Sequence, residues 1–404
     1  MFHTLLAYES LTENDANLDL DTIKKYIDYP VVKPHYRISV LNPDESVNYV
    51  IPSTDIPEGG ISYTEEYQNG QRRNITLQLI NTDRKYTPSI NGIWLDTKFL
   101  FEIGLTIKKE IYWFSKGIYI MGDVNLTDND SEKIINIQLK DKYAIFEGKM
   151  GTLESAYEVE VGSDIGEALS GIFNFTTGNG YILDYKNIIL DPSFVGFKTQ
   201  STIRVEEGGN LGQVIEQLAI QLSAEYYYNN LGNFCMYPIN ETIDDSNKPI
   251  IWTYSKAKMD IQNLSASYKN EEVINVVKVV GDNIDNGIYS AVVTNENPAS
   301  PICIQRIGRR IAPKYTEPNI WNNELAYDLA RYYLRKASFI GVDFSVNVGF
   351  NPILAVNNIC ELENDNAGLK RDKLLLTSLS FNSSDGIMSL NLCSTQDLPF
   401  VYST

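Results

Sequence analysis

Hydrophobic and polar residues alternate most regularly between residues 61 and 80. The apolar side chains there occupy odd positions: Ile61, Tyr63, Tyr67, Ile75, Leu77 and Leu79. This alternation predicts two half-buried strands, 61–67 and 74–80, joined near Asn69 and Gly70. A two-residue turn at Asn69-Gly70 would put the two apolar stripes on opposite faces of the hairpin. A three-residue loop, 68–70, with Gly70 left-handed, pairs odd with odd and gives the stripes a shared face.

Short apolar segments separated by Pro, Gly and Asn/Asp clusters continue this pattern through residue 146. They predict further strands at 36–40, 101–107, 111–114, 118–121 and 134–139. Closely spaced strands with short turns are typical of a barrel or sandwich, so residues 35–149 are expected to form a first β-barrel domain. Residues 1–34 are acidic and polar, with a short helix predicted at 21–29, and are expected to be an N-terminal arm.

The pattern changes after residue 148, where helical periodicity appears. Asp164, with Glu167 three residues later, is typical of a helix start. A stronger helix is predicted at 211–224, with Asn210 as its cap and Gln213 at the reciprocal position. A second hairpin, 225–228 with 233–237, follows it. Residues 150–260 are therefore expected to form an α+β middle domain.

From residue 261 the chain is again mostly β. Strands are predicted at 273–280, 288–294, 341–348, 358–363, 374–381 and 388–393, with one helix at 323–337. Residues 261–404 are therefore expected to form a second β-barrel domain with one helix. The expected fold class is mainly β with an α+β insert, in which two small barrels flank a helix-containing middle domain.

Composition fits a globular chain with an acidic surface. Of the 404 residues, 43% are hydrophobic and 21% charged, and the net charge is −18. Such a balance argues against a protein that grips nucleic acid through its phosphates. Four scattered cysteines and two histidines give no metal-ligand spacing and suit a reducing cytoplasm. No signal peptide is evident, and no apolar run approaches the ~20 residues of a membrane span.

Candidate catalytic and ligand sites are weak. Adjacent carboxylates occur at Glu65-Glu66, Glu206-Glu207, Asp244-Asp245 and Glu271-Glu272. Neighbours on a strand point to opposite faces, so such pairs do not supply the geometry of a glycosidase. The Asp/Asn-rich loops 123–130, 282–287 and 363–368 do not match a calcium-binding loop, and the glycine-rich stretch 207–210 lacks the lysine of a phosphate loop. We expect no catalytic site, metal or cofactor.

The basic residues cluster in two places. Arg72 and Arg73 lie at the start of the second strand of the first hairpin, while Arg309 and Arg310 lie in the segment IQRIGRR. In an acidic chain such groups are more easily donors of ion pairs at a protein interface than a DNA-binding patch. These four arginines are our interface candidates.

Three blocks in order resemble phage tail hub proteins. The first is the hairpin with NGQRR followed by N-x-D-x-x-Y-T-P, which is similar to the first barrel of that family. Residues 202–236 resemble its helix-plus-hairpin middle segment. Residues 276–311, with a V-x-G turn, N-P-x-S-P and I-x-x-I-G-x-R, resemble its second barrel.

The resemblance implies a structural, non-enzymatic virion protein of a baseplate or tail hub. It implies a homotrimer whose six similar barrels form a ring, with the tail tube or distal tail protein on one side and the spike or tail-tip protein on the other. DNA would pass through the lumen without specific binding, and assembly would take place in the host cytoplasm. The net charge suggests acidic channel walls that repel phosphate. We expect any enzyme that cuts the cell wall to be another subunit.

Two alternatives stay open at this point. A receptor- or carbohydrate-binding tail protein would need exposed aromatic side chains in a groove, for which Tyr226, Tyr227 and Tyr228 are the candidates. A glycosidase would need paired carboxylates across a cleft, and the sequence offers no such cleft to name.

Overall fold

The structure, a computed structural model, describes residues 20–27 and 34–394, except 90–91, 108, 130–132, 176–183, 185, 223, 239–249, 256–260, 269–270, 272, 284–286, 301, 318–319, 321 and 338–341. Strands predominate in these residues, which confirms the expected mainly β class. Most of the N-terminal arm lies outside the described residues. Its predicted helix is present as α2 (Leu20–Ile27), and Ile23 and Ile27 are buried in the main core.

The first β region forms one half of a large sheet. Its strands are β1 (His35–Leu41), β2 (Val47–Val50), β3 (Ile61–Glu66), β4 (Arg73–Ile80), β5 (Lys98–Ile107), β6 (Glu110–Asp128) and β7 (Lys133–Asp141). They lie in the order β3-β4-β7-β6-β5-β1-β2, each antiparallel to its neighbour. The sequence pattern located six of these strands and missed β2, whose residues show no alternating burial.

The break predicted between strands 111–114 and 118–121 is wrong. A single strand, β6, runs through both segments and pairs with β5 and β7. Gly117 lies within it at a φ of 114°, beside the register shift between Leu100 and Glu102 on β5. The glycine therefore marks a β-bulge and not the end of a strand.

The C-terminal strands extend the same sheet. They are β13 (Ile250–Ser255), β14 (Ile261–Tyr268), β18 (Val342–Gly349), β19 (Ile359–Asn364), β20 (Leu369–Asn382) and β21 (Ile387–Ser394). The order β14-β18-β21-β20 continues directly into β3, because β20 pairs antiparallel with β3 from Ser378–Glu66 to Asn382–Ser62. Both β regions also share one hydrophobic core, in which Tyr63 stacks on Phe381 at 5.1 Å between ring centroids.

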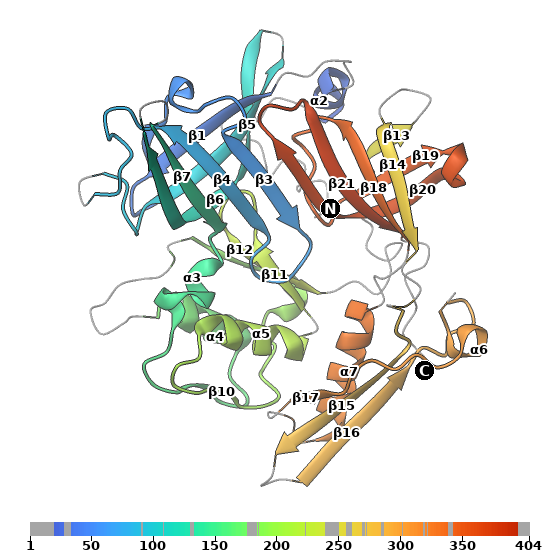
Figure 1. Cartoon of the computed structure of the whole chain (residues 1–404). Helices are drawn as coiled ribbons and strands as arrows, with labels where there is room; N and C mark the ends of the chain where they lie inside the picture. The colour runs from blue at the N-terminus through green and yellow to red at the C-terminus, as the bar shows by residue number, and fades with distance from the viewer. Residues whose placement is uncertain are drawn as a thin grey trace.

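The middle region packs below this sheet in Figure 1. It contains α3 (Ala144–Glu147), β8 (Tyr157–Val159), α4 (Ile165–Phe173), β9 (Ile188–Leu190), β10 (Ile203–Val205), α5 (Leu211–Leu222), β11 (Ala224–Tyr228) and β12 (Phe234–Pro238). Both predicted helix starts are confirmed: Asp164 accepts from the Gly166 and Glu167 amides, and Asn210 and Gln213 bond reciprocally. The region has a core of its own, into which α5 points its apolar stripe.

A smaller unit lies beside the middle region (Figure 1). Its strands β15 (Val276–Asn283), β16 (Gly287–Thr294) and β17 (Tyr315–Glu317) form a separate sheet covered on one face by α7 (Asn323–Ala337). The short helix α6 (Ile304–Ile307) precedes β17. This unit falls inside the range 261–404 that the sequence assigned to the second barrel. Those boundaries stay a prediction.

The pairing predicted for the first hairpin is confirmed, and the loop length is wrong. Ile61 pairs with Leu77 and Tyr63 with Ile75, so odd positions face odd ones, and these side chains are fully buried. Gly70 is left-handed, as expected, at a φ of 78°. The connection, however, spans residues 67–72, because the Tyr67 amide donates to the Thr377 carbonyl of β20 and leaves the hairpin.

Candidate functional site

Buried charges gather where the large sheet meets the middle region. We call Glu65, Arg72, Arg73, Lys116, Lys142, Asp184 and Glu225 the junction cluster; each side chain is almost fully buried. Three come from strands β3, β4 and β6, two from the residues next to β4 and β7, one from the segment before β9 and one from β11. Because burial of unpaired charge is costly, their partners define the arrangement.

Arg73 forms the centre of the junction cluster. Its Nε lies 3.0 Å from Oε1 of Glu65, its cross-strand partner, and its Nη1 donates to the Asn229 carbonyl at 3.2 Å. The Tyr63 hydroxyl donates to the second oxygen of Glu65 at 3.1 Å. One guanidinium thus joins β3, β4 and the turn after β11.

Arg72 makes a second link to the same hairpin. Its Nη2 lies 3.0 Å from Oε2 of Glu225, and its guanidinium stacks 3.8 Å from the ring centroid of Tyr227. Asn357, from the loop before β19, donates to the same carboxylate. Arg72 and Arg73 are therefore engaged inside the chain, and a contact between subunits through either of them stays a prediction.

Two lysines complete the junction cluster. Lys116 donates to the Leu354 carbonyl at 2.7 Å, and its burial lowers its pKa to about 8. Lys142 lies 2.5 Å from Asp184 and 2.6 Å from Glu45; burial lowers its pKa, although both carboxylates oppose this. Burial likewise raises the pKa of nearby Asp141 to about 6. These shifts follow from desolvation of charges in a packed interface.

The predicted turn residues dock the hairpin loop on other regions. The Gly70 amide donates to the Tyr226 carbonyl at 2.9 Å, and the Asn69 amide group donates to the Tyr332 hydroxyl of α7 at 3.2 Å. The loop 67–72 thus contacts the middle region and the smaller unit at once. Sequence reasoning placed these two residues in a turn and had no signal for their distant partners.

Replacement of Gly70 by alanine is expected to destabilise the chain more than the same change at Gly162. Both glycines are left-handed, at φ of 78° and 83°, and each substitution costs about 1–2 kcal/mol of backbone strain. At Gly70 the new Cβ would also lie 2.7 Å from the Tyr143 ring, which adds about 1–3 kcal/mol, whereas nothing lies within 4 Å at Gly162. Urea unfolding of the two variants measures the difference. Equal losses of stability in the two variants would show that the Tyr143 ring moves aside at no cost in free energy.

Arg309 and Arg310 lie apart from the junction cluster. Both are exposed, in the segment between α6 and β17, and Arg306 is exposed beside them. The backbone of Arg310 bonds with Asn275, which holds this segment against the start of β15. The structure therefore separates the four predicted interface arginines into a buried pair and an exposed pair.

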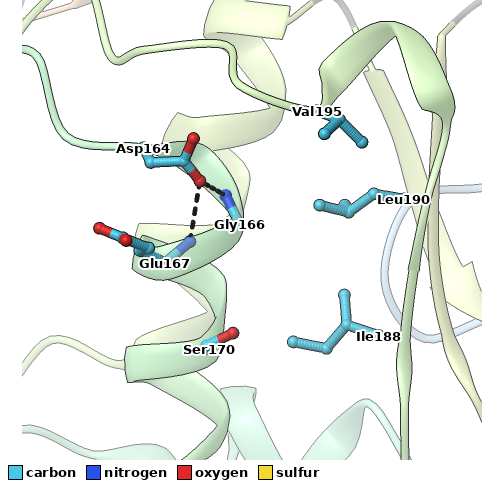
Figure 2. Close-up of a pocket in the computed structure, with 7 residues that line it drawn as sticks. All are labelled: Asp164, Gly166, Glu167, Ser170, Ile188, Leu190 and Val195. Carbon is cyan, nitrogen blue, oxygen red and sulfur yellow. Dashed lines mark hydrogen bonds between the residues drawn. The ribbon is translucent and has the colours of Figure 1, made fainter.

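A surface groove runs beside α4 (Figure 2). It has a volume of about 680 Å³, with Asp164, Glu167 and Ser170 on the helix side and the apolar side chains Ile188, Leu190 and Val195 opposite. Oδ1 of Asp164 caps the helix, and the described residues that line the groove include no basic side chain. Across the described part of the chain, no three His, Cys, Asp or Glu side chains gather as a metal site would require. The described helices also include none that is both long and apolar enough to span a membrane.

The tyrosines named for carbohydrate binding are not available for it. Tyr226, Tyr227 and Tyr228 are all buried, Tyr226 and Tyr228 in the middle core and Tyr227 under Arg72. The expectation of an exposed aromatic groove at this run is wrong. A run of three buried tyrosines forms because β11 is covered on both faces.

No protein-family model and no curated protein matches the sequence. Solved structures with a similar fold do match the chain. A 43 kDa tail protein of prophage MuSo2 from Shewanella oneidensis matches with a TM-score of 0.55 over 90% of this chain and 99% of its own, at 12% identity. A tail protein from Neisseria meningitidis MC58 matches with a TM-score of 0.57 over 91% and 99%, at 11% identity.

The chain has the fold of phage tail proteins. The resemblance to tail hub proteins is thereby confirmed at the level of the fold. The third block, residues 276–311, was expected in the second barrel but lies in the smaller unit, whose sheet is separate from the large one. A chain of the Francisella PdpA–VgrG complex shares this tail-protein fold, with a TM-score of 0.53 over 93% of this chain and 54% of its own, at 11% identity.

Proposed function

We propose that the chain is the hub of a phage or phage-derived tail baseplate, a structural and non-enzymatic protein of the virion. Three copies would form a ring that joins the tail tube or distal tail protein to the spike or tail-tip protein and lets DNA pass. The observation that carries the proposal is the match of fold along nearly the whole length of two tail proteins. A protein that shared one domain with them would not match end to end.

The ring would be built from two barrels in each copy. We assign the first to residues 35–149 and the second to β14 and β18–β21 within 261–404. Strand β13 pairs with β19 of the second barrel, while the rest of the middle region 150–260 and the smaller unit are appendages. The continuous sheet through β3 and β20 supports this assignment, because it fixes the two halves in one orientation. Six similar barrels from three copies would then match a six-fold tube above and a three-fold spike below.

Light scattering on the purified chain tests the proposal. A mass three times the 45.7 kDa of one chain, with a central hole in negative-stain images, is the expected result. A compact monomer both alone and with the tail proteins of the same phage would contradict the hub. Carbohydrate binding has no observation in its favour once the tyrosine run is seen to be buried.

Reversal of charge at Arg309 and Arg310 is expected to weaken the trimer without unfolding the monomer. The two side chains are exposed in a chain of net charge −18, so a neighbouring copy offers them an acidic surface. Like charges opposed at an interface cost several kcal/mol, which is at least a tenfold loss of affinity. The double variant Arg309→Glu, Arg310→Glu is compared with Lys133→Glu, Lys149→Glu, which changes the charge equally at other exposed sites. Trimers of equal stability in the two would remove these arginines from the interface.

A further inference from the structure

The outer face of the large sheet is almost free of charge across seven adjacent strands, β14-β18-β21-β20-β3-β4-β7. One row of directly paired residues crosses six of these strands: Asn263, Asn347, Ser389, Ser380, Thr64 and Asn74. A second row continues from Ser62 through Thr76 to Gln138. These side chains are exposed or half-buried, while the residues between them fill the core.

The charged residues of this face lie at its margins. They are Asp343 on β18, Glu66 at the end of β3 and Lys140 on β7, and the exposed charges at the first residues of β20 (Lys370, Arg371, Lys373) and of β7 (Lys133) lie beyond the two rows. In a chain that is 21% charged, with a net charge of −18, an exposed face of this size would ordinarily carry many acidic side chains. The acidic surplus is therefore concentrated on other surfaces of the molecule.

The polar groups of this face bond to one another across the strands. Ser389 donates to Asn347 at 3.0 Å, and Asn391 donates to Ser378 at 2.8 Å. Ser345 donates to Asn391 at 2.5 Å, and Thr76 bonds with Gln138 at 3.1 Å. Groups that already have partners gain little from a bond to a passing molecule.

This chemistry suits a surface past which a polyanion moves. DNA is held by cations that displace its counterions and by aromatic rings that stack on bases, and the two rows contain neither a cation nor a ring. An acidic wall would instead raise the energy of a duplex confined beside it. A protein partner would need apolar, aromatic or arginine anchors, which the two rows lack.

We propose that this uncharged face lines the channel of the ring and that duplex DNA passes along it. The inference rests on the proposed hub function and replaces the acidic walls expected from the net charge. The low charge lets the duplex slide because attraction and repulsion are both small. The cross-strand bonds Ser389–Asn347 and Thr76–Gln138 occupy polar groups of the two rows and help to hold the strands in place.

Cysteine labelling locates the face in the assembled ring. All four native cysteines are buried, so background reaction with a maleimide is small. Thr64→Cys and Ser389→Cys place a thiol on the face, and Ser155→Cys places one on an exposed bend of the middle region as a control for labelling. Each full-length variant is labelled with maleimide nanogold and imaged by negative stain together with its mass.

Gold at the centre of a three-fold ring for Thr64→Cys and Ser389→Cys is the expected result. Gold at the periphery of an intact ring would overturn the channel assignment and leave the hub standing. A monomer in every condition, with every variant labelled, would overturn the hub and the channel together.

A second experiment tests whether DNA is the molecule that passes along this face. The Thr64→Arg, Ser380→Arg ring is expected to retain a labelled DNA duplex at low salt and to release it as salt rises, while the unmodified ring retains none. If gold labelling places the face at the centre of the ring but the arginine variant does not retain the duplex, the proposal that DNA passes along this face is overturned.

Discussion

Replacement of Arg73 by methionine is expected to lower the free energy of unfolding by about 3–5 kcal/mol. The substitution leaves the Glu65 carboxylate buried without its cation, since Glu65 is 1% exposed and its remaining partner is the Tyr63 hydroxyl. It also removes the bond to the Asn229 carbonyl. Chemical denaturation monitored by tryptophan fluorescence gives the difference from the wild type.

The double variant Arg73→Met, Glu65→Gln is the matched control for this prediction. It removes both buried charges, and replacement of an entire buried ion pair is often close to neutral. We therefore expect the double variant to be more stable than Arg73→Met alone. A double variant as unstable as the single one would mean that packing, and not the unpaired carboxylate, causes the loss.

The second large effect is a pH dependence that belongs to Lys116. Burial lowers its pKa from the usual 10.5 of a lysine to about 8 in the folded state. Between these values the unfolded chain holds a proton that the folded chain has released, so stability rises with pH across this window. A shift of this size corresponds to about 3 kcal/mol.

Lys116→Met removes this dependence. The stability of the wild type relative to Lys116→Met is expected to rise by about 3 kcal/mol between pH 7 and pH 11. Measuring the difference cancels the other groups that titrate in this range. Lys140→Met, at an exposed lysine of β7, should show no such change. A pH-independent difference would place the folded pKa of Lys116 near its usual value.

Much of the fold was predictable because local patterns dictate it. The parity of Ile75, Leu77 and Leu79 determined both the buried face and the register of the first hairpin. The caps at Asp164 and Asn210 marked helix starts correctly, because a cap needs partners only two or three residues away. The helix predicted at 323–337 ends at the residues expected.

The features that the sequence did not predict depend on residues that are distant along the chain. Arg72 pairs with Glu225, 153 residues away, so nothing near it in the sequence distinguishes a buried guanidinium from an exposed one. The strand pattern around Gly117 resembles two strands because a bulge interrupts the alternation. Tyr227 looked available for ligands because the burial of both faces of β11 depends on regions far along the chain.

The pairing of β3 with β20 also determines when the largest sheet can close during synthesis. In sequence, 322 residues separate Ile61 from its partner Ser383. At roughly 5–20 residues per second, the ribosome needs about 15–60 s to supply that partner. Throughout this interval the free edge of β3 presents unpaired N–H and C=O groups, which are a template for pairing with another chain. Aggregation of this protein is therefore expected to begin on nascent chains and not from the folded state.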